Sequence, residues 1–316
     1  MSKVKIFHNE PIAIELIEDT FKASFNIDFD TKYWEWRFLN NPNSKKTYIS
    51  YIIEDGVLAA YYAVSPMKVI IDGKEEKIAL SNMTMTHPNY RGRGYFKKLA
   101  QTLFDDLKKD DFIGVFGFAN HNSHYGFRKY LNWIDLSSLC LFQVKPDEFR
   151  NIKIQDNSVE IKQEEFTEEI LNSISQLKVT TNKISLKRDK NNIDWRLKNN
   201  PSNSYKVQVG RVENKIVSLL FYKKFNTEID ILEFFFDESI DTTNLLNFNI
   251  SSLIKETNAA INLWSNLHTE EHINLEKQGF QEKSFNTYFG VIPFVEGKNI
   301  LDYKNWHYRF IDSDIF

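Results

Sequence analysis

The sequence predicts a mixed α/β protein made of two lobes that share one fold. Residues 84–99 read as a strand, a turn containing Arg-Gly-Arg-Gly and then an amphipathic helix. A second pattern, Trp-Arg-x-x-Asn-Asn-Pro, occurs at residues 36–42 and returns at residues 195–201, an offset of 159 residues. A repeat of this length indicates two copies of one domain, and a chain of 316 residues has room for both.

Each element of the first copy follows from local signals. Pro11 opens a helical stretch, and Asp30 or Thr31 caps a second helix that Pro42 forbids to continue. Asp55-Gly56 is a hairpin signal between two apolar runs. The expected order is a strand within residues 1–7, these two helices, strands at 48–54, 57–71 and 77–86, a helix ending near 109, a strand at 112–118, a helix at 124–131 and a strand at 133–144.

Composition limits the class of protein. Apolar residues make up 42% of the chain and charged residues 26%, as in ordinary globular proteins, and no window approaches the ~20 apolar residues that cross a membrane. Since a signal pattern is missing as well, we expect a cytoplasmic protein without a membrane partner. The single cysteine, Cys140, argues against a cysteine-rich metal site, and the net charge of −3 gives no reason to expect nucleic acid.

The turn at residues 87–95 predicts an anion site. Pro88 ends the strand because proline cannot donate to a sheet ladder. Gly92 and Gly94 leave backbone N–H groups bare at the start of a helix, where the helix dipole favours negative charge, and Arg91 and Arg93 add full charges. A diphosphate would bind well there. The alternative is a plain basic turn on the surface, whereas the spacing excludes a P-loop or a dinucleotide fingerprint.

The repeat also gives the expected domain boundaries. We expect a first lobe at residues 1–145, a polar linker at 146–158, a second lobe at 159–292 and a tail at 293–316. Where the second copy should carry the glycine turn, the sequence is acidic and contains no glycine, so this lobe is expected to be degenerate. The tail is too aromatic for a disordered end, and we expect it to pack back on the lobes.

These features resemble the GNAT (GCN5-related N-acetyltransferase) superfamily in its tandem two-lobe form. The resemblance rests on the order of elements, on the strand that ends in His87-Pro88, and on the phosphate-loop pattern Gln/Arg-x-x-Gly-x-Gly/Ala. Residues 91–95 fit this pattern, and Phe96 departs from it at the last position. The resemblance covers the first lobe directly and the second through the repeat. It implies lobes with a mostly antiparallel, centrally splayed sheet flanked by helices.

The resemblance implies an acetyl-CoA-dependent N-acyltransferase in which a substrate amine attacks the thioester directly in a ternary complex. A backbone N–H of the strand before the loop would polarise the thioester carbonyl. No metal is expected. The residues that the resemblance assigns to coenzyme A are Met85, Thr86, Arg91, Gly92, Arg93, Gly94, Tyr95, Phe96 and Asn120.

The proton-transfer groups are marked less plainly. The superfamily often places a tyrosine acid in the helix after the splayed strand, but Arg128 occupies the aligned position, so Tyr125 is the candidate acid. Some tandem enzymes bring their C-terminal segment back to the active site. By that analogy Asp314 is the candidate base, with Asp312 and the terminal carboxylate as alternatives.

The internal repeat separates architectural residues from candidates for acceptor binding. Trp36 and Arg37 persist in both copies, so we expect them to be architectural, with the arginine tying down helix-end carbonyls. Trp34 has no aromatic counterpart in the second copy, where Ile193 stands, and is therefore the candidate for lining an acceptor pocket.

The expected acceptor is a primary amine on a small polar molecule, with an amino sugar or a sugar nucleotide as the first candidate by analogy. Two alternatives stay open. One is a tRNA-dependent aminoacyl or peptidyl transferase of the tandem type, which the Arg-Gly-Arg-Gly loop speaks against. The other is a non-catalytic acyl-CoA-binding protein, which the missing tyrosine permits.

Overall fold

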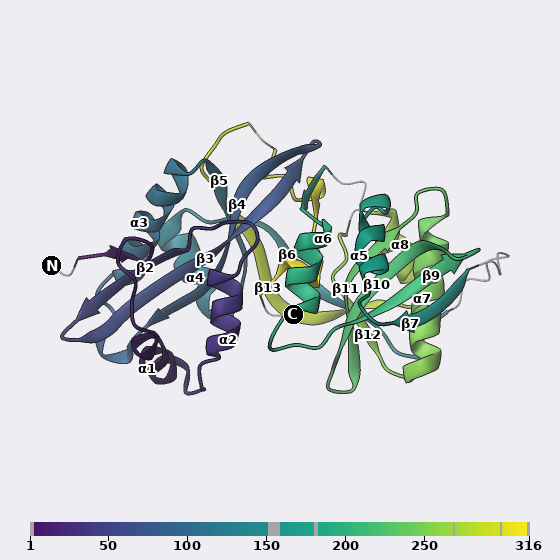
Figure 1. Cartoon of the computed structure of the whole chain (residues 1–316), viewed down its shortest axis with the longest axis horizontal. Helices are drawn as coiled ribbons and strands as arrows, with labels where there is room; N and C mark the ends of the chain where they lie inside the picture. The colour runs from purple at the N-terminus through teal and green to yellow at the C-terminus, as the bar shows by residue number, and fades with distance from the viewer. Residues whose placement is uncertain (1–2, 151–158, 180–182, 268, 298, 315–316) are drawn as a thin grey trace. The chain divides into compact units, whose positions relative to one another are not determined.

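The computed structural model describes residues 3–150, 159–179, 183–267, 269–297 and 299–314 (Figure 1). Over these residues the chain forms two compact units, each with a mostly antiparallel sheet and its own helices, which confirms the predicted mixed α/β class. Unit 1 comprises Met1–Ser138 and Thr287–Leu301, and unit 2 comprises Leu139–Asn286 and Asp302–Phe316. Within the described residues, no helix is both long enough and apolar enough to span a membrane.

The sheet of unit 1 has the strand order β1-β2-β3-β4-β5-β13, in which β4 and β5 run parallel and the other neighbours antiparallel. The elements of the first copy are β1 (Lys5–Ile6), α1 (Ile14–Phe25), α2 (Thr31–Trp34), β2 (Tyr48–Glu54), β3 (Val57–Ile71), β4 (Lys74–Thr86), α3 (Tyr95–Lys109), β5 (Phe112–Ala119), α4 (His121–Leu131) and β6 (Ile134–Val144).

Most of these elements match the prediction, and the differences have local causes. Asp55 and Gly56 join β2 to β3 with φ of 52° and 79°, the left-handed pair that a two-residue hairpin needs. Helix α4 begins earlier than expected because Asn120 caps it. The Asn120 side chain accepts hydrogen bonds from the N–H groups of Asn122 and Ser123.

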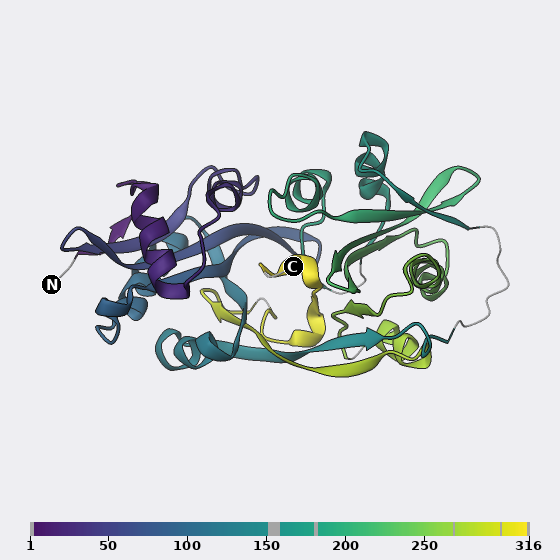
Figure 2. The same cartoon turned by 90° about the horizontal axis from the view of Figure 1, so that it is seen from below.

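Apolar side chains alternate along the central strands and form a core on each face of the unit 1 sheet. On one face, Tyr62 and Val64 of β3 pack with residues of α3 and α4. On the other face, Tyr61 and Ala63 pack with residues of α1 and α2. Figure 2 shows α1 and α2, in purple, on one side of these strands and the teal α3 and α4 on the other. The two faces therefore bury different sets of residues from the same strand.

The sheet of unit 2 has the order β7-β9-β10-β11-β12-β6, with β11 and β12 as its parallel pair. A short parallel pair, β8 with β14, belongs to the same unit. The remaining elements are β7 (Glu160–Glu164), α5 (Glu168–Ser173), β8 (Ile184–Leu186), α6 (Lys190–Ile193), β9 (Lys206–Val212), β10 (Lys215–Phe225), β11 (Glu228–Phe236), α7 (Thr242–Thr257), β12 (Ile261–Leu263), α8 (Glu270–Lys277), β13 (Gln281–Pro293) and β14 (Trp306–His307).

The repeat is visible in the backbone. Helices α2 and α6 both begin after an aspartate cap, at Asp30 and Asp189. Both then pass into a π-helical turn, at Glu35–Leu39 and Asp194–Lys198. The strand orders of the two sheets also correspond one to one, with the parallel pair at the same place in each. Two copies of one fold are therefore present, as the sequence predicted.

Each unit takes its last strand from the other half of the sequence. In unit 1 the end of β13 pairs with β5, with Tyr288 opposite Ala119. In unit 2 the end of β6 pairs with β12, with Val144 opposite Ile261. The units therefore divide after Ser138, within β13 and after Leu301, whereas the sequence placed the lobe ends at residues 145 and 292. Most of the expected linker, 146–158, lies outside the described residues.

Candidate functional site

The candidate site of unit 1 lies where two parallel strands separate. β4 pairs with β5 from Lys77 opposite Phe112 to Leu80 opposite Phe116. Beyond this point β4 continues to its end paired with β3, and β5 continues paired with β13. The facing edges of β4 and β5 thus carry backbone groups that the described sheet pairs do not use. This is the central splay that the family resemblance implied.

An irregularity in β4 lies at the separation. The register between β3 and β4 passes from Ala63 opposite Met83 to Val64 opposite Ser81. Asn82 is therefore an extra residue, a β-bulge, which bends the strand and re-aims the residues that follow. Unit 2 has a register shift between β10 and β11 within one residue of the matching place. There the extra residue is Leu232 of β11.

The side chain of Asn82 holds the bulge in place. With its amide oriented to satisfy its neighbours, Nδ2 donates to the carbonyls of Ala63 and Leu80 at 3.2 and 3.3 Å. Oδ1 accepts from Nε of Arg37 at 2.9 Å and from Oγ of Ser65 at 2.8 Å. Arg37 is 1% exposed. A buried arginine from the π-helical turn therefore supports the strand at the point where it leaves β5.

The repeat partner of this arginine has a different role. Arg196 in unit 2 donates to the carbonyls of Ile311 and Ser313 at 3.1 and 2.7 Å, at the end of a short helical turn of the C-terminal segment. Trp36 and Trp195 are both buried, as expected for architectural residues. The prediction that the arginine ties down helix-end carbonyls thus describes Arg196. Arg37 supports the bulge through Asn82.

Beyond the bulge, alternate residues of β4 direct their backbone groups to opposite sides. The N–H of His87 donates to a carbonyl of β3. Because every second residue of an antiparallel strand directs its backbone N–H and C=O to the same side, those of Met85 also point to β3. Thr84 and Thr86 then face the side from which β5 has separated. In agreement, the carbonyl of Thr86 accepts from Nε of Arg91 at 3.4 Å. The sequence predicted that the backbone of Met85 and Thr86 binds the cofactor. The backbone groups of Thr86 face the side that β5 has left, whereas those of Met85 face β3 and those of Thr84 face the open side.

The turn after β4 leads to a helix start without a side-chain cap. Gly92 and Gly94 have φ of 79° and 74°, in the left-handed region that favours glycine. Gly94 is the N-cap of α3 and makes no side-chain cap hydrogen bond. A Cβ added at either glycine would meet nothing within 4 Å, so the space in front of the loop is open. The geometry fits an anion against the first-turn N–H groups.

Glu54 at the end of β2 organises the basic side chains of this loop. Nη1 of Arg93 lies 3.3 Å from Oε2 of Glu54, and the guanidinium stacks on Tyr90 at 4.7 Å. Tyr95 donates its hydroxyl to the same carboxylate, and Tyr90 donates to the Glu54 carbonyl at 3.2 Å. Sequence reasoning missed Glu54 because only the pairing of β2, β3 and β4 brings it to the loop.

Phe96 departs from the family pattern without blocking the loop. Its ring packs on Tyr62 of β3 and on Phe127 of α4, with centroid distances of 6.0 and 5.4 Å. The side chain therefore faces the core of unit 1. Its backbone N–H stays in the first turn of α3, where the resemblance assigned it to the diphosphate.

At the matching helix start in unit 2, two aspartates disfavour the binding of an anion. Asp241 caps α7 by accepting from the N–H of Asn244 at 3.0 Å. Hydrogen bonds from Lys215 and then from Ser239 lower the pKa of Asp237 to about 2, so this carboxylate stays ionised. Since negative charge already occupies this helix end, a diphosphate gains little there.

The candidate acid lies on the exposed surface of α4. Tyr125 is 65% exposed, and its hydroxyl accepts from Nζ of Lys129 at 2.8 Å. Arg128, which occupies the aligned position of the family's tyrosine, pairs with Asp135 at 3.3 Å. The same carboxylate lies 2.7 Å from Nε2 of His124. In the part of the chain that the structure describes, no group of three or more His, Cys, Asp or Glu side chains could hold a metal ion.

Two predicted site residues lie away from the loop's own elements. Trp34 is 4% exposed, and its indole N–H donates to the hydroxyl of Tyr61 at 2.9 Å. A buried indole with its donor satisfied is a core residue, so this placement argues against the predicted role in lining an acceptor pocket. Asp314 belongs to unit 2 and is half-buried. Its alternative, Asp312, is buried and pairs with Arg188 at 2.6 Å.

Comparisons with known proteins agree with this geometry. Residues 10–133 match the family model of the acetyltransferase (GNAT) domain. No curated protein matches the chain. A solved structure from Enterococcus faecalis V583, described as a conserved protein of unknown function and probable N-acyltransferase, is 15% identical with a TM-score of 0.71. The match covers 93% of this chain and 73% of that chain.

Two further solved structures have the same fold at low identity. A GCN5-related N-acetyltransferase from Anabaena variabilis ATCC 29413 is 15% identical with a TM-score of 0.66, over 91% of this chain and 72% of that chain. A tandem GNAT protein from the clavulanic acid biosynthesis pathway is 9% identical with a TM-score of 0.61, over 94% of this chain and 100% of that chain. These likenesses extend the fold to both units.

The family match spans the parts of unit 1 that form the candidate site. Residues 10–133 include the strands that separate, the glycine loop and α4. Residues 10–133 are therefore similar to the acetyltransferase (GNAT) domain, and both units have the fold seen in GCN5-related N-acetyltransferases.

Proposed function

We propose that unit 1 transfers an acetyl group from acetyl-CoA to the primary amine of a small polar acceptor, with an amino sugar or a sugar nucleotide as the first candidate. The observation that carries this proposal is the helix start without a side-chain cap at Gly94, with open space before it and Arg91 and Arg93 beside it. The same helix start in unit 2 carries Asp241 instead. This contrast supports a diphosphate site in unit 1.

The residues around the loop then have distinct roles. The first-turn N–H groups of Tyr95 and Phe96 bind the diphosphate of coenzyme A, and Arg91 and Arg93 balance its charge. The pantetheine arm follows the free edge of β4, where backbone groups of Thr86 accept and donate hydrogen bonds. The exposed amide of Asn120 is a further contact for this arm.

The transfer itself needs an oriented thioester and two proton transfers. An outward N–H of β4 polarises the thioester carbonyl and stabilises the oxyanion. The amine nitrogen forms the new C–N bond, the C–S bond breaks, the ammonium loses a proton to a base, and the thiolate takes one from an acid. We assign the acid to Tyr125 of α4.

Replacing Tyr125 by phenylalanine is expected to lower kcat about 100-fold, because a positioned acid typically contributes 10²–10⁴-fold. The affinity for acetyl-CoA should stay the same in this variant. Steady-state kinetics measure kcat, and calorimetry measures the affinity for acetyl-CoA. An unchanged kcat would remove Tyr125 from the mechanism.

Charge reversal at Arg93 tests the cofactor site. Calorimetry should show acetyl-CoA binding to the wild type and binding weaker by about 10- to 100-fold for Arg93→Glu, the loss of about one charged hydrogen bond. Lys109→Glu is the matched control, because it makes the same charge change at the other end of α3. Equal affinity for the Arg93 variant and the control would contradict the proposed site.

The two alternative functions give different results in the same experiment. Release of free thiol over a panel of primary amines follows turnover. A tRNA-dependent transferase would not bind acetyl-CoA at all. A non-catalytic acyl-CoA-binding protein would bind it but release no thiol with any amine.

A further inference from the structure

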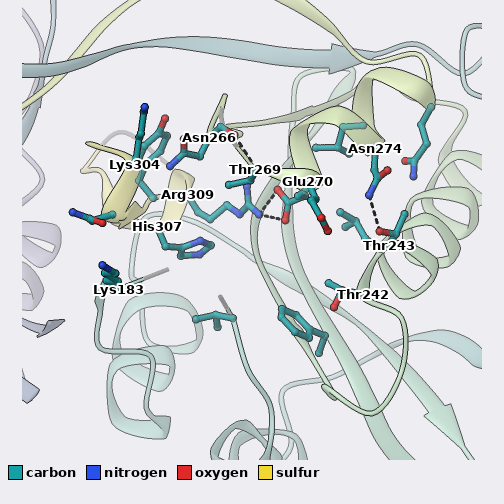
Figure 3. A pocket seen from close by; sticks show the side chains of 18 residues that line it. Lys183, Thr242, Thr243, Asn266, Thr269, Glu270, Asn274, Lys304, His307 and Arg309 are labelled. Carbon is teal, nitrogen blue, oxygen red and sulfur yellow. Dashed lines mark hydrogen bonds and ion pairs between the residues drawn. The ribbon is translucent and has the colours of Figure 1, made fainter. Parts of the chain in front are cut away.

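Unit 2 contains a cavity of about 540 Å³ that the acetyl-transfer proposal does not use (Figure 3). This volume lies within the range of about 300–1,000 Å³ that is usual for small-molecule sites. The start of α7, one face of α8 and the C-terminal segment at residues 304–309 form its walls. Helix α7 corresponds by the repeat to α3 of unit 1, so the degenerate unit has a cavity beside the helix that lost the anion loop.

The wall from α8 carries a stripe of hydrogen-bonding groups. Glu270, Asn274 and Gln278 follow one another at intervals of four residues and line the same cavity. Glu270 is exposed, whereas Gln278 is 1% exposed. The stripe thus begins with a carboxylate that solvent reaches and ends with a buried amide.

The side chain of Gln278 provides the main evidence for a ligand. Among the residues that the structure describes, its buried Oε1 has no hydrogen-bond partner. Buried amide oxygens are almost always paired, because an unpaired one loses its hydration without replacement. A ligand that donates a hydrogen bond would satisfy this oxygen.

Polar contacts join α8 to the other walls of the cavity. Nδ2 of Asn274 donates to Oγ1 of Thr243 at 2.8 Å, which ties α8 to the start of α7. Arg309 donates to both carboxylate oxygens of Glu271 at 2.5 Å, so these two charges balance each other. Glu270 therefore differs from Glu271, since its carboxylate is exposed at the same helix start.

Two lysines complete the lining. Lys183 and Lys304 are exposed, and Figure 3 shows them together at the opposite end of the view from Asn274 and Thr243. An exposed ammonium is well hydrated and its field is screened over about one Debye length. The two cations therefore influence the rim more than the interior beside α8.

We infer that this cavity binds a small hydroxylated primary amine of about amino-sugar size. Its ammonium pairs with the Glu270 carboxylate, and its hydroxyl groups bond to Asn274 and to the threonines of α7. One hydroxyl donates to Oε1 of Gln278. A diphosphate is disfavoured because Asp237 and Asp241 hold negative charge at the start of α7. The site lies within one unit and needs no acetyl-CoA.

Calorimetry of the full chain with glucosamine, in the absence of acetyl-CoA, tests the inference. We expect saturable binding that Gln278→Met and Glu270→Gln each weaken at least 10-fold. Glu276→Gln is the matched control, because it lies on α8 outside the lining and should leave the affinity unchanged. A thermal melt of each variant confirms that unit 2 still folds. Arg93→Glu should keep glucosamine binding while its affinity for acetyl-CoA falls, which separates this site from the proposed function.

Three results would overturn the inference. The first is no binding of glucosamine, and the second is binding that neither lining variant changes. The third is a ligand preference that contradicts the charges of the cavity. If glucose binds as tightly as glucosamine, Glu270 has no role in binding. If serine binds more tightly than glucosamine, the lysines hold the carboxylate of a zwitterion.

Discussion

Replacing Arg37 by methionine is expected to lower kcat for acetyl transfer about 100-fold, with little change in the affinity for acetyl-CoA. Arg37 donates to Oδ1 of Asn82, and Asn82 in turn donates to the carbonyls of Leu80 on β4 and Ala63 on β3, which fixes the bulge between the two strands. The outward backbone groups of β4 follow directly after this bulge. A shift of about 1 Å in groups that position a reacting bond costs on the order of 100-fold in rate. The diphosphate site at α3 is built from other residues and should be unaffected.

The internal repeat supplies a matched control for this prediction. Arg196→Met removes the corresponding buried arginine of unit 2, which donates to carbonyls of the C-terminal segment. Both variants should lose thermal stability, and kcat should fall for Arg37→Met alone. Asn82→Leu, which introduces the residue type found at the unit 2 bulge, should reproduce the effect on kcat. If both arginine variants lose kcat only in proportion to their unfolded fraction, the bulge does not position the thioester.

Local chemistry explains why so much of the fold could be predicted. The hairpin at Asp55-Gly56 and the helix start after Gly94 each depend on residues adjacent in sequence, and the structure has both where the sequence predicted them. The repeat at 159 residues predicted two copies of one fold because whole motifs, with their caps and prolines, recur. Signals of this kind need no knowledge of the tertiary structure.

Long-range pairing explains what the sequence did not reveal. Glu54 reaches the loop only because β2, β3 and β4 lie side by side, and nothing near Glu54 in sequence marks it. The bulge at Asn82 depends on the register of two strands. Neither periodicity nor composition shows that β13 completes the sheet of unit 1, since a strand reads the same whichever sheet it joins.

Trp34 illustrates the same limit in a single side chain. Its absence from the second copy suggested a specific role, yet a tryptophan near a helix end reads the same in a core as in a pocket. The hydrogen bond to Tyr61 and the 4% exposure come from packing against β3, which the sequence does not encode locally. A difference between two repeats therefore indicates divergence but not its purpose.

Glu233 of β11 is the centre of a buried charge network in unit 2. Oε2 accepts from Nε of Arg188 at 2.8 Å, and Oε1 lies 3.3 Å from Nε2 of His307 and 3.8 Å from Nε of Arg309. Burial alone would raise the pKa of Glu233, but His307 and the two arginines outweigh it and lower the pKa to about 2. Because His307 and Arg309 come from the C-terminal segment, Glu233 fixes that segment to the sheet of unit 2.

Glu233→Gln is expected to lower the free energy of unfolding of unit 2 by about 3–5 kcal/mol, because it leaves buried cations without a counter-charge. The pKa of the folded state lies below the value of about 4.3 for an unfolded glutamate. The contribution of the wild-type carboxylate is therefore complete above about pH 4.3 and is lost as the pH falls toward 2. Urea unfolding between pH 7 and pH 2.5 should show this loss in the wild type and not in the variant. Glu238→Gln, which removes an exposed ion pair with Lys178, should change stability by about 1 kcal/mol or less, and an equally small effect at Glu233 would contradict the network's role.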